Sequence, residues 1–147
     1  MKLTKKFWVS LLGCVLVLLP VMISCSETKT TPQPATGKYK VPDAPAEYLS
    51  MTNPYTSQED VTKGGELYQG KCSDCHGEMG EGDEDGDDVA FNDTEWMKTR
   101  TDGQLFYIAR NGAGPDMEME AYGPGSDAGM SEKKIWQIVS YIRTLAK

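Results

Sequence analysis

The sequence has a single histidine, few basic side chains and few apolar residues beyond its first 23 positions. One histidine among 147 residues excludes any metal site that needs two histidines from the same chain. Lys and Arg total 15 against 22 Asp and Glu, which gives a formal charge of −7, and the basic residues do not cluster. Nucleic-acid binding is therefore not expected. The length suits one ordinary domain, and the 15 Gly and 8 Pro indicate a loop-rich fold.

The N-terminus has the pattern of an export signal. Three lysines within the first six residues precede an apolar run over 7–23, as in the charged and apolar regions of a secretory signal. The run ends in the letters MISC, with the cysteine at Cys25, and this resembles the lipobox of bacterial lipoproteins. In that motif the signal is cut before the cysteine, which is then acylated. We therefore predict a signal peptide over 1–24 and lipid attachment at Cys25.

Two alternatives to this interpretation remain. The letters LLGC, ending at Cys14, form a second near-match, but the apolar run before them is short. An uncleaved membrane anchor is the other alternative, although the run is shorter than the span of about 20 apolar residues that a membrane helix needs. In each case the rest of the chain lies outside the cytoplasm. Removal of 1–24 takes away three Lys and no acid, leaving 12 basic and 22 acidic side chains and a formal charge of −10.

The segment after Cys25 is expected to be a tether. Residues 26–34 are rich in Ser, Thr, Pro and Lys without periodicity, so they cannot bury enough surface to order themselves. Residues 47–55 are more apolar, and we expect them to lie against the domain surface. The predicted organisation is a lipid anchor and tether over 25–56, followed by one folded domain over 57–147.

The strongest motif is C-S-D-C-H, which runs from Cys72 to His76 and contains the only histidine. C-x-x-C-H is the attachment signature of c-type haem. Thiols three residues apart can reach the two vinyl groups on one porphyrin edge, and the adjacent histidine can then ligate the iron. The motif predicts one covalent haem c on Cys72 and Cys75, with His76 as the proximal axial ligand. A buried porphyrin would also supply the core that this apolar-poor chain lacks.

Other uses of the motif fit less well. A structural zinc site needs four nitrogen or sulfur ligands, and only these three and the acylation-prone Cys25 are available. A thioredoxin-like C-x-x-C needs a βαβ context, and no strand-rich pattern flanks this one. A disulfide between Cys72 and Cys75 would leave His76 unexplained.

Local signals predict helices around the motif. Ser57 with Asp60, and Thr101 with Gln104, have the spacing of capping boxes, and Ser131 can cap a last helix with apolar residues at helical spacing. The predicted helices are 61–70, a weaker 92–100, 102–110, and one that begins after Ser131.

Three stretches resemble class I monohaem cytochromes c. The letters GGELY at 64–68, CHGEMGEG at 75–82 and IWQIVSYIR at 135–143 are similar to the first helix, the glycine-rich turn and the last helix of that family. The resemblance covers 58–147. It implies an all-α cytochrome c fold, with about four to five helices around one haem.

The same resemblance implies how two helices meet. In the family the first helix packs across the last near the haem edge. Carried over, Gly64 would let the two backbones approach, and Tyr68 would pack on Ile138 and Tyr141.

The second axial ligand is expected to be a methionine. A thioether favours ferrous iron and raises the reduction potential, which suits an electron carrier. The letters MEAY at 119–122 lie in a Gly- and Pro-rich loop, and they resemble the family's Met-Pro-Ala-aromatic pattern with Glu in place of Pro. We predict Met119 as the distal ligand, with Met117 as the alternative. Met79 lies too close to His76 to reach the opposite face, and Met130 stands where the family has an apolar residue.

Acidic residues gather just after the motif. Residues 78–88 hold seven acids and no base. They form either a solvated loop or a docking face for a basic partner. Residues 81–92 are also a near-miss to a calcium loop. Beyond them, Trp96 or Arg100 could donate to a haem propionate or pack in the core.

Together these features predict an electron carrier, not an enzyme, since two filled axial positions leave no room for substrate at the iron. The protein would be exported and lipid-anchored at a bacterial cell envelope, facing the periplasm or the exterior. There it would shuttle single electrons between redox partners. The alternatives are a haem c subunit of a membrane oxidoreductase or terminal oxidase complex, and a haem sensor or enzyme with an open sixth site.

Overall fold

A computed structural model of the chain describes residues 39–83, 88–115 and 117–146. The predicted signal peptide over 1–24, the predicted lipid attachment at Cys25 and the tether as far as residue 38 lie outside the described residues. Within the described part, none of the helices combines the length and the apolar character needed to cross a membrane.

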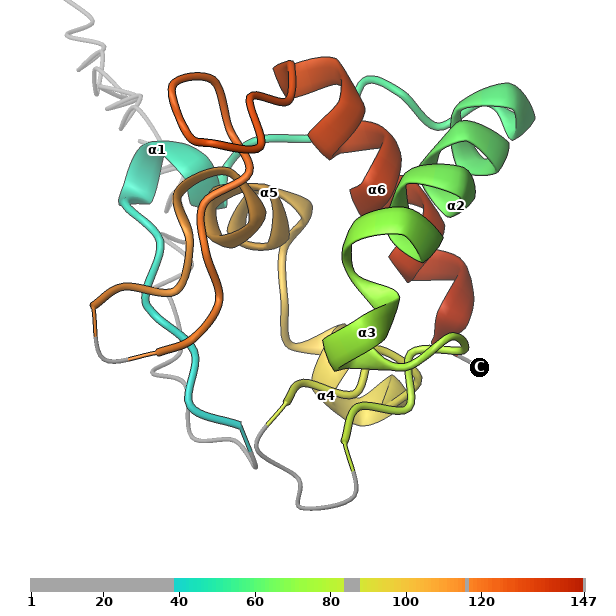
Figure 1. Cartoon of the computed structure of the whole chain (residues 1–147), viewed down its shortest axis with the longest axis horizontal. Coiled ribbons are helices and arrows are strands. Elements are labelled where there is room, and N and C mark those ends of the chain that lie inside the picture. The colour runs from blue at the N-terminus through green and yellow to red at the C-terminus, as the bar shows by residue number, and fades with distance from the viewer. Residues whose placement is uncertain (1–38, 84–87, 116, 147) are drawn as a thin grey trace, which may run out of the picture. The chain divides into compact units, whose positions relative to one another are not determined.

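The described residues form helices and loops, without a strand (Figure 1). The all-α prediction is therefore confirmed, with six helices, of which α1 and α3 are four-residue single turns. The helices are α1 (Ala46–Leu49), α2 (Gln58–Lys71), α3 (Ser73–His76), α4 (Thr94–Lys98), α5 (Asp102–Asn111) and α6 (Glu132–Leu145).

The longer helices begin at the side-chain caps that the sequence indicates. Ser57 accepts a hydrogen bond from the Asp60 N–H, so α2 starts three residues earlier than predicted. Thr101 and Gln104 form a reciprocal capping box at the start of α5, and Ser131 caps α6. These caps satisfy N–H groups that have no partner within the helix itself. The weaker helix predicted over 92–100 shortens to the five residues of α4.

Helices α2 and α6 pack closely against each other on one side of the domain (Figure 1). A Cβ atom at Gly64 would collide with the backbone carbonyl of Gln137, so only glycine permits this approach of the two helices. One turn later, Tyr68 is fully buried and its ring lies 5.2 Å from that of Tyr141. The crossing places the end of α2, and with it Cys72, beside the buried face of α6.

Residues 39–55, ahead of α2, pack on the helices rather than standing away from them. Tyr48 of α1 stacks on Phe106 of α5. Asn53 donates one hydrogen bond to the Trp136 carbonyl and another to the Ser140 hydroxyl of α6. Tyr39, at the start of the described part, is 2% exposed. About half of the expected tether, residues 39–55, is therefore in contact with the folded body.

Substitution at Gly64 tests the helix crossing. Gly64→Ala should lower the free energy of unfolding by about 1–3 kcal/mol, because the added methyl overpacks against the Gln137 carbonyl. The measurement is guanidinium unfolding of the cofactor-loaded protein, followed by circular dichroism. Gly70 in the same helix is the matched control, since a Cβ there meets nothing within 4 Å. Gly70→Ala should raise stability by about 0.5–1 kcal/mol, and equal effects of the two changes would contradict the tight crossing.

Candidate functional site

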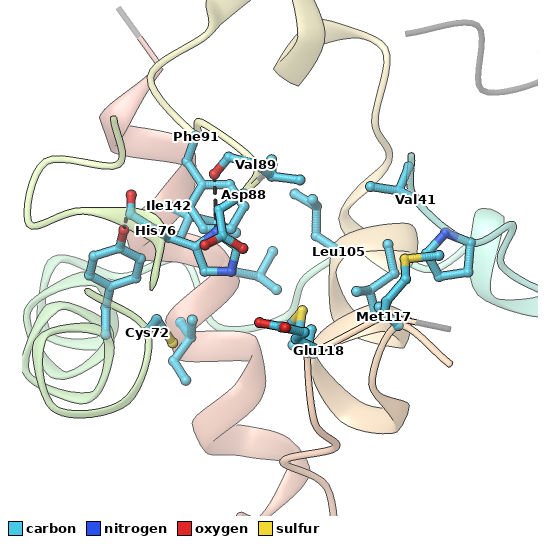
Figure 2. A pocket seen from close by; sticks show the side chains of 18 of the residues that line it. Val41, Cys72, His76, Asp88, Val89, Phe91, Leu105, Met117, Glu118 and Ile142 are labelled. Carbon is cyan, nitrogen blue, oxygen red and sulfur yellow. Dashed lines mark hydrogen bonds between the residues drawn. The ribbon is translucent and has the colours of Figure 1, made fainter. Parts of the chain in front are cut away.

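A cavity of about 470 Å³ opens beside the C-x-x-C-H motif, within the range of about 300–1,000 Å³ usual for cofactor sites. His76 stands on one side of it and Met117 on the other (Figure 2). The apolar wall between them comes from α5 and α6, and it consists of Leu105, Ile108, Ala109, Ile138, Val139 and Ile142. Segments far apart in the sequence therefore meet around one space.

His76 is held in one tautomer. Its Nδ1 lies 3.0 Å from the carbonyl oxygen of Val89, as the dashed line in Figure 2 marks. A carbonyl can only accept a hydrogen bond, so Nδ1 is the donor, and in the neutral imidazole Nε2 is then the nitrogen with the lone pair. The ring is 8% exposed and lies 4.6 Å from the ring of Phe91. An imidazole oriented through one nitrogen by a backbone carbonyl is the usual arrangement of a metal-ligating histidine.

The turn after the motif is braced by hydrogen bonds. Gly77 ends α3 with a positive φ of 78°, a conformation that favours glycine. Its carbonyl accepts a 2.7 Å hydrogen bond from the buried Tyr68 hydroxyl of α2. The carbonyl of His76 accepts another from the Gly82 N–H, at 2.9 Å. The histidine is thus held by its backbone as well as by its ring.

The two cysteines of the motif are free thiols in different surroundings. Cys72 lines the cavity, and burial raises the pKa of its thiol to about 12. Cys75 is exposed and lies outside the cavity lining. Its pKa is raised by partial burial and by the charges of Asp88, Asp74 and Glu118. Redox-active C-x-x-C pairs have a thiol with a lowered pKa, so these surroundings do not favour thioredoxin-like chemistry.

Both predicted distal ligands, Met117 and Met119, line the cavity and are half-buried. Their backbones are fixed to different degrees. Met119 accepts a 3.0 Å hydrogen bond from the Ala113 N–H just after α5, whereas Met117 donates only to Gly114 within its own turn. The chain after Met119 stays tied to α5, because Tyr122 N–H donates to the Ala109 carbonyl at 3.0 Å.

Three other methionines of the described part lie elsewhere. Met79 is 58% exposed, while Met97 and Met130 are buried in the core. None of the three is among the residues that line the cavity. The loop that carries Met119 is also joined to the motif directly, since the Tyr122 hydroxyl donates to the Lys71 carbonyl at 3.0 Å.

Two buried hydrogen-bond donors at the site have no partner within the described part of the chain. They are Nε1 of Trp96, a residue of the cavity lining, and Nε of Arg100. The Arg100 guanidinium lies 4.9 Å from the centre of the Trp96 ring, and its burial lowers its pKa. Buried donors are normally paired, so the pair suits an anionic group. A haem c fits this set of groups: two thiols for covalent attachment, an imidazole and a thioether for the iron, and two hydrogen-bond donors for the propionates.

The acidic loop is described in part. Residues 84–87, in the middle of both the acidic run and the near-miss to a calcium loop, lie outside the described residues. Asp83 and Asp88, on either side of this gap, line the cavity, as does Glu118 from the methionine loop. Among the residues that the structure describes, no three His, Cys, Asp or Glu side chains are grouped so as to hold a metal ion.

The cavity lining includes three residues that the sequence analysis missed. Lys40, Val41 and Pro42 line it from the segment ahead of α1. Their neighbours in sequence have the composition of a linker, which gave no reason to assign them to a site. The one feature of the sequence that could have indicated their burial is the presence of Tyr39 and Val41 in an otherwise polar stretch.

Residues 59–142 match the family model described as cytochrome c oxidase, cbb3-type, subunit III. That match spans more than half of the chain. No curated protein sequence matches the chain.

Solved structures show the same fold. The chain is similar to cytochrome cL from the marine methylotrophic bacterium Methylophaga aminisulfidivorans MPT, with 22% identity and a TM-score of 0.52 over 71% of each chain. It is also similar to cytochrome cL from Hyphomicrobium denitrificans, with 26% identity and a TM-score of 0.50. That alignment covers 71% of this chain and 64% of the other. The expected cytochrome c fold is therefore confirmed.

Proposed function

Because the chain belongs to the cytochrome c family of the cbb3-type oxidase subunit III model, we propose that it shuttles single electrons between redox partners at the bacterial cell envelope. Membership of the family implies one covalently bound haem c and a role in electron transfer. The proposal extends this to a particular ligand set, a docking surface and a location.

One observation carries the proposed ligand set: an imidazole with a free Nε2 and a methionine loop face each other across one cavity. Cys72 and Cys75 would form the two thioethers, and His76 would be the proximal ligand. Met119 would be the distal ligand, because its backbone is hydrogen-bonded to the end of α5. Met117 is the alternative, since it lines the same cavity.

A bound haem would supply one-electron exchange between ferrous and ferric iron. The chain would set the solvent contact, the axial ligands and the reduction potential of that haem. The apolar wall from α5 and α6 would pack on the haem and limit its contact with water. The hydrogen bond from His76 to the Val89 carbonyl would orient the imidazole for ligation. A methionine thioether would favour the ferrous state and raise the potential. Trp96 Nε1 and Arg100 Nε would donate to the propionates.

Electron exchange with a basic partner is supported by the charges around Cys75. This cysteine is exposed, and Asp88, Asp74 and Glu118 lie close enough to raise the pKa of its thiol. The porphyrin edge bonded to Cys75 would therefore reach the surface within a ring of negative charge. Such a field steers a positively charged partner toward the edge from which electrons leave.

The proposed location rests on the N-terminal sequence. Acylation of Cys25 after removal of 1–24 would anchor the chain to a membrane on the outer side of the cytoplasmic membrane, with the haem domain facing the periplasm or the exterior. A tether over the following residues would keep the domain near membrane-bound partners and raise its effective concentration there.

A second candidate function is a haem c subunit of a terminal oxidase complex, favoured by the description of the matching family model. Stoichiometric co-purification with other subunits would separate it from a free shuttle. A sensor or enzyme with an open sixth site is less well supported, because Met117 and Met119 both line the cavity and Met117 lies across it from His76 (Figure 2).

Spectra of ligand variants test the proposed function. The oxidised protein should be low-spin with a sulfur-to-iron charge-transfer band in the near infrared. Met119→Ala should abolish that band, because the thioether is removed, while Met117→Ala should keep it. His76→Ala should destroy normal low-spin ligation. A wild-type protein that is high-spin without the band would contradict the electron-carrier proposal, and loss of the band in Met117→Ala alone would make Met117 the ligand.

The acidic surface predicts how electron transfer depends on salt. Reduction of the ferric protein by cationic hexaammineruthenium(II) should slow as ionic strength rises, because the attraction is screened. The double variant Asp74→Asn/Glu118→Gln should show a shallower dependence in stopped-flow measurements, with an unchanged visible spectrum as the check on ligation. Asp127→Asn is the control, since Asp127 is exposed and is not among the acids that act on Cys75. Equal slopes in the wild type and the double variant would refute the docking surface.

A further inference from the structure

The segment 39–43 belongs to the cavity although it lies outside the family match, which begins at residue 59. Lys40, Val41 and Pro42 line the cavity. Figure 2 shows Val41 beside Met117, across the cavity from His76. The matched part of the chain therefore supplies the proposed ligands, while this preceding segment closes the space on the methionine side.

Tyr39 connects the segment to the unpartnered donors. Its side chain is 2% exposed, and its ring meets the Trp96 ring edge-on, with centroids 5.6 Å apart and planes at 89°. Trp96 in turn lies under the Arg100 guanidinium. Asp43, at the other end of the segment, acts on Arg100 with its negative charge, which offsets part of the effect of burial on the Arg100 pKa. Both buried donors thus have a neighbour in the segment.

The segment is anchored at its C-terminal end. Tyr48 of α1 contacts the rings of Phe106 and Tyr107 on α5. The backbone of Tyr48 lies so close to Gly103 of α5 that a Cβ there would collide with it. Pro42 and Pro45 restrict the backbone between these contacts and Tyr39. This lowers the conformational entropy that the segment loses when it packs against the cavity.

We propose that residues 39–43 form a cover of the haem cavity, in which Tyr39 positions Trp96 and Arg100 and the segment restricts access of small ligands to the iron on the methionine side. This inference rests on the proposed placement of the haem in the cavity. Tyr39 is a positioning residue, because it acts on the haem surroundings through Trp96 and not through a ligand bond.

Displacement of the distal methionine by imidazole tests the cover. Full-length ferric protein, purified with its haem, is titrated with imidazole and followed by the loss of the sulfur-to-iron band. Tyr39→Ala should raise the affinity for imidazole by roughly two- to tenfold, the change that corresponds to loss of one aromatic pair. The midpoint potential should fall, since weaker pairing of the propionates and entry of water both favour the ferric state.

Two variants serve as controls for this experiment. Tyr39→Phe keeps the ring that packs on Trp96, so its imidazole affinity and potential should stay closer to the wild type than those of Tyr39→Ala. Glu47→Ala changes an exposed residue of α1 that does not line the cavity and should have no effect. If Tyr39→Ala does not hold haem, Val41→Ser gives the same test, because Val41 lines the cavity.

The outcomes separate the cover from the function it rests on. A wild-type protein without a low-spin spectrum and sulfur-to-iron band would overturn both. A wild-type protein with that spectrum, whose imidazole affinity and potential are unchanged in Tyr39→Ala and Val41→Ser, would overturn the cover alone. Equal changes in Tyr39→Ala and Glu47→Ala would also overturn it, since they would reflect general loosening of the segment.

Discussion

His76 Nδ1 donates a 3.0 Å hydrogen bond to the Val89 carbonyl, and that hydrogen bond determines which ring nitrogen can bind a metal. Free imidazole exchanges its proton between two nitrogens, and only the unprotonated one can bind a metal. By accepting a hydrogen bond from Nδ1, the loop after the acidic run makes Nε2 the ligating nitrogen of the neutral ring. The Tyr68 hydroxyl donates to the Gly77 carbonyl, and the Gly82 N–H donates to the His76 carbonyl. Both α2 and the turn after the motif therefore help to orient His76.

The chain builds its site into its hydrophobic core. Trp96, Leu105 and Val139 belong both to the core cluster and to the cavity lining. The cavity of about 470 Å³ opens to solvent, and its wall from α5 and α6 is apolar. A haem bound there would cover apolar surface that water would otherwise contact, so haem binding and the packing of α5 and α6 would be coupled. Glycine at position 64 lets α2 and α6 cross closely, which places Cys72 beside the same core.

Local features of this chain were predictable from sequence and long-range ones were not. The C-x-x-C-H motif, the caps at Ser57, Thr101 and Ser131 and the glycine at the helix crossing each act over a few residues or carry a family pattern. The choice between Met117 and Met119 depends on how the loop pairs with the end of α5, which the missing proline leaves open in the sequence. The partner of His76 is a backbone carbonyl, and no side-chain pattern marks a carbonyl. The cover over 39–43 depends on contacts with Trp96, more than fifty residues away.

The charges around the cavity would act both on the reduction potential of the haem and on the approach of a partner. A negative charge about 10 Å from the iron, at an effective dielectric constant of about 20, favours the ferric state by roughly 1.7 kcal/mol. Asp83, Asp88 and Glu118 line the cavity and would act in that direction, whereas the proposed thioether ligand and a guanidinium on the propionates would act against it. The acids that attract a basic acceptor therefore also make the electron easier to give up. In a carrier that passes electrons to a positively charged surface, the same carboxylates would both attract the acceptor and favour release of the electron. Docking of the partner would neutralise these charges and raise the reduction potential again.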